Sequence, residues 1–452
     1  MKERTKRQKA IIRRRIFLSV TAAVLVVCIA AICITVNVIV KNVNSADKSD
    51  TNNSAITSQP SDDVSSKTDD LNKVVATATV VNTGDIILHS TILNGAKTDD
   101  GNYDFSAFFK ETENYFKSAD LATANLEVTL GGTESGAFSG YPAFNSPDSL
   151  LDVIKNSGLG FLTTANNHCY DTGLFGLKRT AAQLKTKNID FIGTKETDDD
   201  PTYTIKNVNG IKIGMTAYTF ENTSDAGQKS INGNIVKAEA VGLINSFNYD
   251  RINEFYAEAQ SVVESMKNDG ADAVVFYMHW GEEYQLSNNT WQKSIAQKLC
   301  NMGVDVIVGG HPHVVQPIEL IHSEDSQNTA VCIYSMGNAV SNQRKELMNP
   351  ECTTGHTEDG MLFYYTFEKY ASGDVALTGV DIIPTWVNKY RGGSGYQYTI
   401  YPLESASMAE SYGFDAATLS LAKASFERTK QQLAKSLSEC QKYLGCEIRF
   451  AE

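Results

Sequence analysis

The chain has 452 residues, of which 42% are hydrophobic and 21% charged, so its composition is that of a globular protein with a sizeable core. Eight basic side chains and one acid give residues 1–15 a charge of +7, and because the whole chain carries −13, the remainder carries −20. A part this acidic excludes general nucleic-acid binding, which needs clustered Lys and Arg, and it would need local cations to receive an anionic substrate.

An apolar run follows the basic residues. Residues 16–40 contain no charged side chain and can cross a hydrocarbon core of roughly 30 Å as a helix. We predict an uncleaved transmembrane signal anchor, with residues 1–15 as a cytoplasmic tail and the rest of the chain outside the cell. A cleaved signal peptide is the alternative, but its apolar region would be shorter and would end in small residues, whereas this run ends in Val38, Ile39 and Val40. The expected location is the cell membrane, as a single-pass protein with an extracytoplasmic domain.

The composition changes twice after the apolar run. Residues 41–73 are dominated by Ser, Thr, Asn and Asp and predict a disordered linker, because so few apolar side chains cannot form a core. From residue 74 onward, strand and helix patterns alternate. We expect one domain over residues 74–400 and a C-terminal helical extension over residues 401–452 that packs on it.

The elements of this domain are predicted from apolar periodicity, capping residues and glycines. The expected strands are residues 74–82, 121–128, 161–165, 211–220, 273–280, 304–310 and 331–338, followed by an antiparallel pair at 361–370 and 375–387. The expected helices are residues 105–118, 146–158, 177–188, 290–302 and 415–444. Strands that alternate with helices before a set of antiparallel strands predict an α/β (α+β) layered sandwich.

Six cysteines lie outside the apolar run, and no CxxC pair occurs among them, which argues against a zinc-ribbon or thioredoxin motif. An oxidising exterior would permit disulfides, whose pairing the sequence does not assign. The apolar surroundings of Cys300 and Cys332 favour free core residues.

Five segments place polar side chains just beyond the carboxyl end of a predicted strand, the edge at which open α/β sheets bind ligands. They are residues 83–89, 124–127, 165–173, 278–284 and 309–316. Five of the seven histidines fall in these segments, namely His89, His168, His279, His311 and His313. Imidazole together with carboxylate and amide oxygens suits Zn²⁺, Mn²⁺ or iron, whereas Ca²⁺ sites use oxygen alone. The set predicts a metal site, although any one of these residues alone would be explained as well by a structural histidine or a turn.

The spacing of His311 and His313 carries further information. On an extended backbone these two side chains point to opposite sides, so each would serve a different ion. Paired ions clamp the attacking and leaving oxygens of a displacement and supply an activated water near neutral pH. We therefore expect two divalent ions, of Mn, Fe or Zn.

Six sequence blocks resemble, in order, the motifs of the CapA family of poly-γ-glutamate capsule proteins, a branch of the calcineurin-like metallophosphatases. They read GDIILH, NLEVTL, ANNHCYDTG, HWGEEY, GVDVIVGGHPHVVQPIE and YSMGNAVSN, and the resemblance covers roughly residues 76–345. It implies a four-layer αββα metallophosphatase-like sandwich, a surface location, and a role in making, exporting or anchoring poly-γ-glutamate.

The resemblance also implies roles for individual residues. The implied metal ligands are Asp85 and His313 for one ion, Glu127 as the bridge, and Asn167, His279 and His311 for the other. The implied general acid is His168, oriented by Asp171. Residues expected to line the site are His89, Asn125, Asn166, Trp280, Glu282, Tyr284 and Asn338. The alternatives are core packing for Trp280 and Tyr284, a solvated loop for Glu282, and a turn for Asn338.

Two positions depart from the metallophosphatase pattern. Metallophosphatases usually open with Asp-x-His, whereas here His89 follows Asp85 by four residues. The bridging position holds Glu127, which is one methylene longer than the usual Asp. Both departures concern the first ion, so a single ion, or two weakly held ions, is the alternative.

Three functions fit these features. The leading expectation is a metal-dependent hydrolase or transferase that acts outside the cell on an anionic polymer such as poly-γ-glutamate, or on a phosphoester. The second is a non-catalytic component that tethers or exports the capsule together with other capsule proteins, which the anchor and linker favour. The third is a general metallophosphoesterase. In each case the chain contacts the membrane through its N-terminal helix and binds no nucleic acid.

Overall fold

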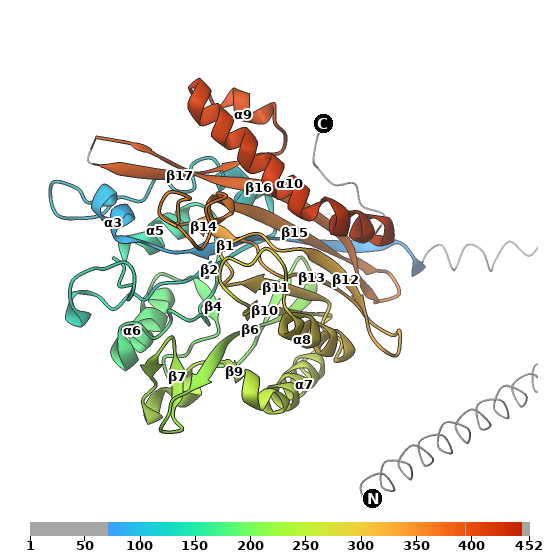
Figure 1. Ribbon diagram of the computed structural model, residues 1–452. Coiled ribbons are helices and arrows are strands. Elements are labelled where there is room, and N and C mark those ends of the chain that lie inside the picture. Colours follow the sequence, from blue (N-terminus) through green and yellow to red (C-terminus); the bar gives the residue numbers. More distant parts are fainter. Residues whose placement is uncertain (1–70, 394, 445–452) are drawn as a thin grey trace, which may run out of the picture. The chain divides into compact units, whose positions relative to one another are not determined.

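A computed structural model of the chain describes residues 71–393 and 395–444. The predicted apolar span 16–40 and nearly all of the predicted linker lie outside the described residues. Among the helices that are described, none combines the length and apolar composition needed to cross a membrane. The described part has a mixed α/β fold built from two β-sheets and the helices around them (Figure 1).

The first sheet contains eight strands within the described residues. Their bounds are Val74–Ile86 (β1), Leu121–Leu126 (β2), Phe161–Thr163 (β3), Asp190–Ile192 (β4), Asn338–Val340 (β14), Asp359–Tyr370 (β15), Val375–Arg391 (β16) and Tyr396–Pro402 (β17). The order is β17-β16-β15-β1-β2-β3-β4, with β14 paired to the end of β1. Strands β1 to β4 run parallel, whereas β15, β16 and β17 extend the sheet in antiparallel pairs.

The second sheet contains nine strands within the same residues. Their bounds are Thr204–Val208 (β5), Ile211–Thr223 (β6), Lys229–Ile231 (β7), Asn234–Ile235 (β8), Ser246–Asn248 (β9), Ala273–His279 (β10), Val306–Gly310 (β11), Ile318–His322 (β12) and Thr329–Ile333 (β13). The order is β12-β13-β11-β10-β6-β7-β8, and β5 and β9 also pair with β6. Its centre, β6-β10-β11-β13, is parallel.

Helices pack on both sheets, and hydrophobic clusters join the elements. The helices are Ser90–Ala96 (α3), Glu113–Ser118 (α4), Ser149–Asn156 (α5), Gly173–Thr186 (α6), Ile252–Asn268 (α7), Thr290–Asn301 (α8), Met408–Ser411 (α9) and Ala416–Leu444 (α10). One cluster joins the two sheets, for example Val80 of β1 and Val275 of β10. A second joins the first sheet to α3, α4 and α5, and a third joins the second sheet to α7 and α8.

The local sequence explains the elements that lead to the site. Strand β10 is a continuous apolar run whose seven residues are all buried, as expected for a central parallel strand covered on both faces. Helix α8 begins with a capping box, in which the side chains of Asn289 and Gln292 each bond the other's backbone N–H. These features fix the strand and the helix on either side of the loop that follows His279.

Most predicted elements are confirmed, including the antiparallel pair β15–β16 and the terminal helix α10. The predicted helix 105–118 is wrong in its first half, because the helix begins at Glu113. The carboxylate of Asp104 accepts a hydrogen bond from the N–H of Ser106 at 2.8 Å, which favours a turn there. The aromatic side chains of residues 105–109 then pack into the core from turns.

The C-terminal helix α10 lies across β16 and β12 (Figure 1). Its Arg428 donates two hydrogen bonds to the carboxylate of Asp359 on β15, from Nε at 2.7 Å and from Nη2 at 2.6 Å. Since the Asp359 side chain is 1% exposed, this pair places a buried charge at the junction of helix and sheet. Such a charge is tolerated only while its partner is present.

We expect Arg428→Met to lower the free energy of unfolding by about 3 kcal/mol, because it leaves the buried carboxylate of Asp359 unpaired. Urea denaturation followed by circular dichroism measures this change. Lys423→Met is the matched control on the same helix, since its more exposed pair with Glu410 contributes less than about 1 kcal/mol. Equal losses in the two variants would contradict an anchoring role for Arg428.

Asp305, just before β11, is a second partly buried acid, and its carboxylate accepts a hydrogen bond from the N–H of Val274 at 2.7 Å. Burial raises the pKa of Asp305 from 3.8 to about 6, although the Val274 hydrogen bond and the charge of Lys267 oppose the shift. The folded chain therefore holds this proton more tightly than the unfolded chain. The stability that the group contributes is complete below pH 3.8 and is lost as the pH rises through about 6.

Asp305→Asn should accordingly gain stability relative to the wild type as the pH rises. We expect the difference in the free energy of unfolding, variant minus wild type, to increase by about 2 kcal/mol between roughly pH 4 and pH 7. Urea titrations across this range measure the difference. Asp198→Asn, which makes the same replacement at an exposed position, is the control. A constant difference for Asp305→Asn would show that folding does not raise the pKa of this carboxyl.

Candidate metal centre

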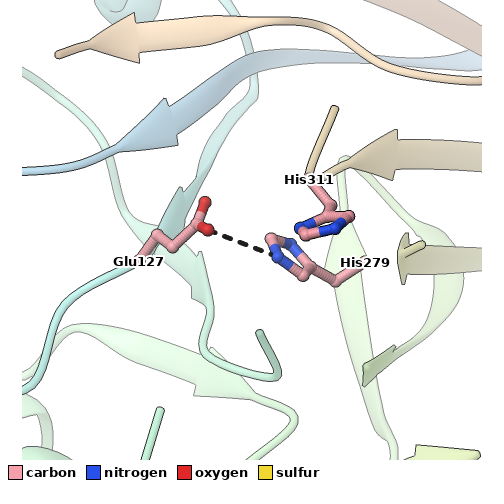
Figure 2. Close-up of side chains that lie close together, drawn as sticks. All are labelled: Glu127, His279 and His311. Carbon is pink, nitrogen blue, oxygen red and sulfur yellow. Dashed lines mark ion pairs between the residues drawn. The ribbon is translucent and has the colours of Figure 1, made fainter. Parts of the chain in front are cut away.

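Strand ends from both sheets meet at one place (Figure 2). Asp85 lies at the end of β1 and Glu127 directly follows β2, while His279 ends β10 and His311 follows β11. All four side chains are buried. In Figure 2, Glu127, His279 and His311 are turned toward one another from these strand ends. The carboxyl edges of the two sheets thus supply a single shared site.

Carboxylate and imidazole atoms form three overlapping groups in which the ligand atoms lie within 4.8 Å of one another. The groups are Glu127–His279–His311, Asp85–Glu127–His313 and Glu283–His311–His313. The predicted amide ligand, Asn167, lies beside the first group, since its Oδ1 is 2.8 Å from Nε2 of His279. The same nitrogen is 3.3 Å from Oε1 of Glu127. The structure therefore brings all six predicted metal ligands to one site.

Asn125 connects the carboxylates of the site. Its amide nitrogen donates to Oδ1 of Asp85 at 2.8 Å and to Oε2 of Glu127 at 3.2 Å. Its amide oxygen accepts a hydrogen bond from Nδ2 of Asn166 at 3.1 Å, and that nitrogen also donates to the Leu126 carbonyl. These bonds orient both carboxylates and leave one oxygen of Glu127 free to bind another group.

The backbone of residues 311–313 is not extended, so the expectation that His311 and His313 point to opposite sides of an extended segment is wrong. Their φ angles are +96° and +56°, in a region that histidine rarely adopts. The N–H of His311 donates to Oδ2 of Asp85 at 3.2 Å, which helps to hold this conformation. At Gly310 a Cβ would lie 2.8 Å from Oδ1 of Asp85, so the close approach requires glycine. The strained turn brings both imidazoles into one ligand group.

The charges of the site balance one another in part. Burial alone would raise the pKa of Asp85, but the hydrogen bond and charge of His313 and the charge of His279 hold it below its usual range. Burial opposes protonation of His313 as well, yet Glu127 and Asp85 raise its pKa to about 9. One protonated imidazole therefore offsets one of two buried carboxylates. His311 is different, because burial and the neighbouring histidines lower its pKa and keep it neutral.

Two buried atoms of the ligand groups have no hydrogen-bond partner within the described residues: Oε1 of Glu127 and Nδ1 of His311. An unpaired polar atom in the interior costs free energy unless another group satisfies it. A carboxylate oxygen and a neutral imidazole nitrogen are both ligand atoms for divalent ions, and these two belong to the same group. The residues present are therefore compatible with a divalent metal ion.

The predicted acid and its orienting partner also lie together. Nδ1 of His168 is 2.8 Å from Oδ2 of Asp171, and this oxygen also accepts the N–H of Phe144 at 2.7 Å. The Phe144 ring meets the His168 ring edge to face, with the centroids 4.6 Å apart. Because Nδ1 is held by the carboxylate, Nε2 is the nitrogen left to exchange a proton with a substrate.

Besides Asn125 and Asn166, three more of the predicted lining residues border the site. The Tyr284 ring centroid is 6.2 Å from that of His313, and Oδ1 of Asn338 is 3.1 Å from His313 Nδ1. The His89 ring meets the Phe144 ring edge to face, at 5.4 Å between centroids. Within the described residues, His89 belongs to none of the three ligand groups. It is therefore a neighbour of the metal-binding cluster and not a member of it.

Two predicted lining residues lie elsewhere. Trp280 is fully buried in the cluster that joins the second sheet to α7 and α8, and its indole N–H donates to the Tyr334 carbonyl at 2.9 Å. Glu282 is exposed and accepts a hydrogen bond from Asn289 at 3.5 Å. The neighbouring Glu283 reaches the histidines instead. Nothing in the sequence separates these adjacent glutamates, because a loop has no periodicity that fixes side-chain direction.

Comparison with known proteins identifies related chains. The family model described as bacterial capsule synthesis protein PGA_cap matches residues 79–343. The PGA biosynthesis protein CapA of Bacillus subtilis (strain 168) is 28% identical over 280 residues, which cover 61% of this chain and 65% of that protein. The capsule biosynthesis protein CapA of Bacillus anthracis is 29% identical over 239 residues, which cover 52% of this chain and 54% of that protein. The chain thus spans somewhat less than two thirds of the length of the curated relatives it matches.

Among solved structures, the NAD nucleotidase (NadN) of Haemophilus influenzae is similar to this chain with a TM-score of 0.42 and 13% sequence identity. The match covers 82% of this chain and 60% of the nucleotidase.

We expect Glu127→Gln and His311→Ala to abolish the binding of divalent ions, because the first removes the negative charge of the bridging carboxylate and the second removes an unpaired imidazole nitrogen. Mass spectrometry of the purified chain, after supplying Mn, Fe or Zn, measures the bound metal. His322→Ala is the control, since this histidine is exposed and outside the cluster, and it should retain the wild-type metal content. Wild-type protein that binds none of these ions would contradict the metal assignment.

Although Glu127→Gln should weaken metal binding, it should not destabilise the metal-free protein. Removing a buried charge that is only partly offset should leave the melting temperature unchanged or raise it. Ion at about 100 times its dissociation constant should stabilise the wild type by about 2.7 kcal/mol and the variant by close to nothing. Thermal denaturation with and without chelator tests both statements, and a large loss of stability in the metal-free variant would indicate a purely structural glutamate.

Proposed function

Because the chain belongs to the family of bacterial capsule synthesis proteins described as PGA_cap, we propose that it takes part in forming a poly-γ-glutamate capsule. Its relatives are named for PGA biosynthesis and for capsule biosynthesis. We propose further that it is a metal-dependent hydrolase or transferase. Its substrate would be the γ-linked glutamate polymer, or an amide or phosphoester made while the polymer is handled.

One observation carries the enzymatic part of the proposal: two carboxylates and three histidines are buried together with ligand atoms unpaired. Burying Asp85 and Glu127 beside each other costs stability that apolar residues would not cost. Perturbed, incompletely paired charges of this kind cluster at functional sites. Bound ions would offset this loss of stability, because they would neutralise the buried carboxylates.

We assign the ligands as the family resemblance implies. Asp85 and His313 would hold one ion, Glu127 would bridge, and Asn167, His279 and His311 would hold a second ion, of Mn, Fe or Zn. The two sheets joined by one cluster, each with helices packed on it, support the four-layer αββα sandwich of the metallophosphatases as the fold.

The ions would supply positive charge that polarises the scissile group and activates water. His168 would act on the leaving group, because its Nδ1 is held by Asp171 and a protonated ring then presents Nε2–H to the leaving oxygen. Asp171 would stabilise the protonated ring and fix its direction. The edge contact with Phe144 limits rotation of the imidazole.

We also propose that residues 16–40 anchor the chain in the cell membrane, with residues 1–15 inside and the domain outside. The basic charge of the first segment and the absence of charge in the second support this orientation. Residues 41–73 would serve as the linker, residues 74–400 as the domain and residues 401–452 as its helical extension. This arrangement would present the site to polymer leaving the cell, close to other capsule proteins.

A non-catalytic role in capsule tethering or export is the second candidate. The predicted anchor and linker favour it, because they hold a domain near the membrane whether or not it catalyses a reaction. In that case the cluster would serve as a binding feature only.

His168→Ala is expected to slow hydrolysis of a γ-linked oligoglutamate or a model phosphoester by about 10²–10⁴-fold, the usual contribution of a general acid. Asp171→Asn should cause a smaller loss, because the ring remains present with its direction less well fixed. The bound metal should stay at the wild-type level in both variants, since neither residue belongs to a ligand group. Rate measurements on the metal-loaded chain test these statements, with His322→Ala as the control.

Other results would favour the alternatives. A wild-type chain that turns over no substrate, combined with normal capsule formation by His168→Ala cells, would favour tethering. Turnover of p-nitrophenyl phosphate without turnover of any γ-linked oligomer would indicate a general metallophosphoesterase.

A further inference from the structure

A polyanionic substrate raises a problem for this chain, because everything after Arg15 carries a net charge of −20. Repulsion from such a domain disfavours an anionic polymer unless cations near the site receive it. Among the described residues, one place near the site carries two neighbouring cations, neither of which forms an ion pair with a described carboxylate. It is the hairpin formed by the end of β16 and the start of β17 (Figure 1).

Lys389 and Arg391 lie on one face of this hairpin. Residues two apart on a strand share a face and lie about 7 Å apart, so both follow Val387 on its side of the sheet. Val387 is buried in the core, whereas Lys389 is half-buried and Arg391 is exposed. In the pairing of β16 with β17, Lys389 is opposite Tyr398 and Arg391 is opposite Tyr396. Along β16, this face of the strand is therefore apolar at Val387 and becomes a cationic and aromatic surface toward the turn of the hairpin.

The tyrosine rings hold both cations in place. Nζ of Lys389 lies 4.5 Å from the ring centroid of Tyr396 and 5.9 Å from that of Tyr398, and the guanidinium of Arg391 lies 4.9 Å from Tyr396. Three of the four cation–π contacts within the described residues belong to this hairpin. Neither cation forms an ion pair with a described carboxylate, so both keep their charge available for a ligand.

A short series of contacts connects the hairpin to the candidate acid. Lys389 donates to Oδ1 of Asn342 at 3.0 Å, and the backbone N–H of Asn342 donates to Nδ1 of His89 at 3.2 Å. The His89 ring meets Phe144, which in turn meets the ring of His168. Lys389 is therefore linked to His168 through Asn342, His89 and Phe144.

The hairpin is also fixed in position beside the site. Helix α3 directly follows His89 and packs against β17. Gln397 donates to the carbonyl of Gly95 at 2.6 Å, and a Cβ on Gly95 would lie 1.7 Å from the carbonyl oxygen of Tyr396. This approach requires glycine and ties the cationic face to the segment that carries His89.

We propose that Lys389 and Arg391, supported by Tyr396, bind successive carboxylates of a γ-linked glutamate chain and lead that chain past His89 to the metal centre. This rests on the proposed function, and it names the polymer itself, through its repeated carboxylates, as the ligand. Two cations on one strand face suit a chain with one carboxylate on every unit better than a single small anion. The methylene groups of the γ-linked backbone can contact the exposed tyrosine ring.

Nearby acids reduce the positive charge around Lys389 and Arg391 but do not cancel it. The acids whose charge reaches Lys389 are Glu346 and Glu358. Glu358 is already paired with Arg344, at 2.6 Å from Nη2. Glu346 is exposed and solvated, so its charge is screened from the ligand more strongly than a buried charge would be.

The test compares binding of a fluorescent γ-linked oligoglutamate to the full metal-loaded chain and to Lys389→Gln/Arg391→Gln. We expect the double variant to bind roughly tenfold more weakly, with a smaller dependence on salt, because two charge-assisted contacts are lost. Lys212→Gln/Lys298→Gln is the control, since it removes the same charge from two exposed lysines that form no ion pair with a described carboxylate, one at the start of β6 and one in the last turn of α8. It should bind like the wild type.

Arg391→Gln alone guards against a folding defect, because its exposed position does not contribute to the core, and it should give an intermediate loss. Equal affinities of the double variant and the control would overturn the proposed binding role of Lys389 and Arg391. The proposed function would still stand if the wild type binds and cleaves the oligomer. Wild-type protein that neither binds nor cleaves it would overturn both. Tighter binding of polyphosphate than of the γ-linked oligomer would overturn the assignment to carboxylates.

Discussion

The charge balance inside the cluster is the constraint on which the rest of the structure depends. Asp85 and Glu127 are completely buried, and the amide of Asn125 and the imidazoles of His279 and His313 lie against them. Such an arrangement is possible only if strand ends from both sheets stop within a few ångströms of one another. The long buried strands and their helices can be understood as the scaffold that holds these ends in register, because displacing one group would leave a buried charge unpaired.

The same scaffold stores strain at the site. Two histidines adopt positive φ angles, a conformation that costs of order 1–3 kcal/mol per residue and persists only where the surroundings enforce it. Here the enforcing contacts are the N–H of His311 on Asp85 and the glycine before it. Unpaired ligand atoms add to that cost. Such strain and incomplete hydrogen bonding are expected in a binding site without its ligand. A cluster whose polar atoms were all paired would gain little free energy from binding an ion.

The sequence predicts most of this arrangement because its signals are local. Histidines and carboxylates that follow apolar strands predict a ligand edge, and the order of strands and helices predicts the layered fold. The position of Glu283 and the turn at residues 311–313 depend on tertiary contacts with other strands, so no local pattern reveals them. The short helix α4 is a similar case, because an Asx turn and core packing of residues 105–109 override the helical periodicity. Phe144 and Phe220 contact site histidines and were indistinguishable in sequence from ordinary core aromatics.

The acidity of the chain and an anionic substrate are compatible if attraction acts at short range. At physiological ionic strength charges are screened over about 8 Å, so most of the −20 charge does not reach a ligand bound at the site. What the ligand experiences is its immediate surroundings, which on one side are Lys389 and Arg391 and at the centre would be bound ions. An acidic exterior with the proposed cationic path would repel such a polymer from most of the surface and admit it along one direction. For an enzyme acting on a long polyanion, that contrast guides the chain better than a uniformly basic surface, which would bind the polymer everywhere and release it slowly.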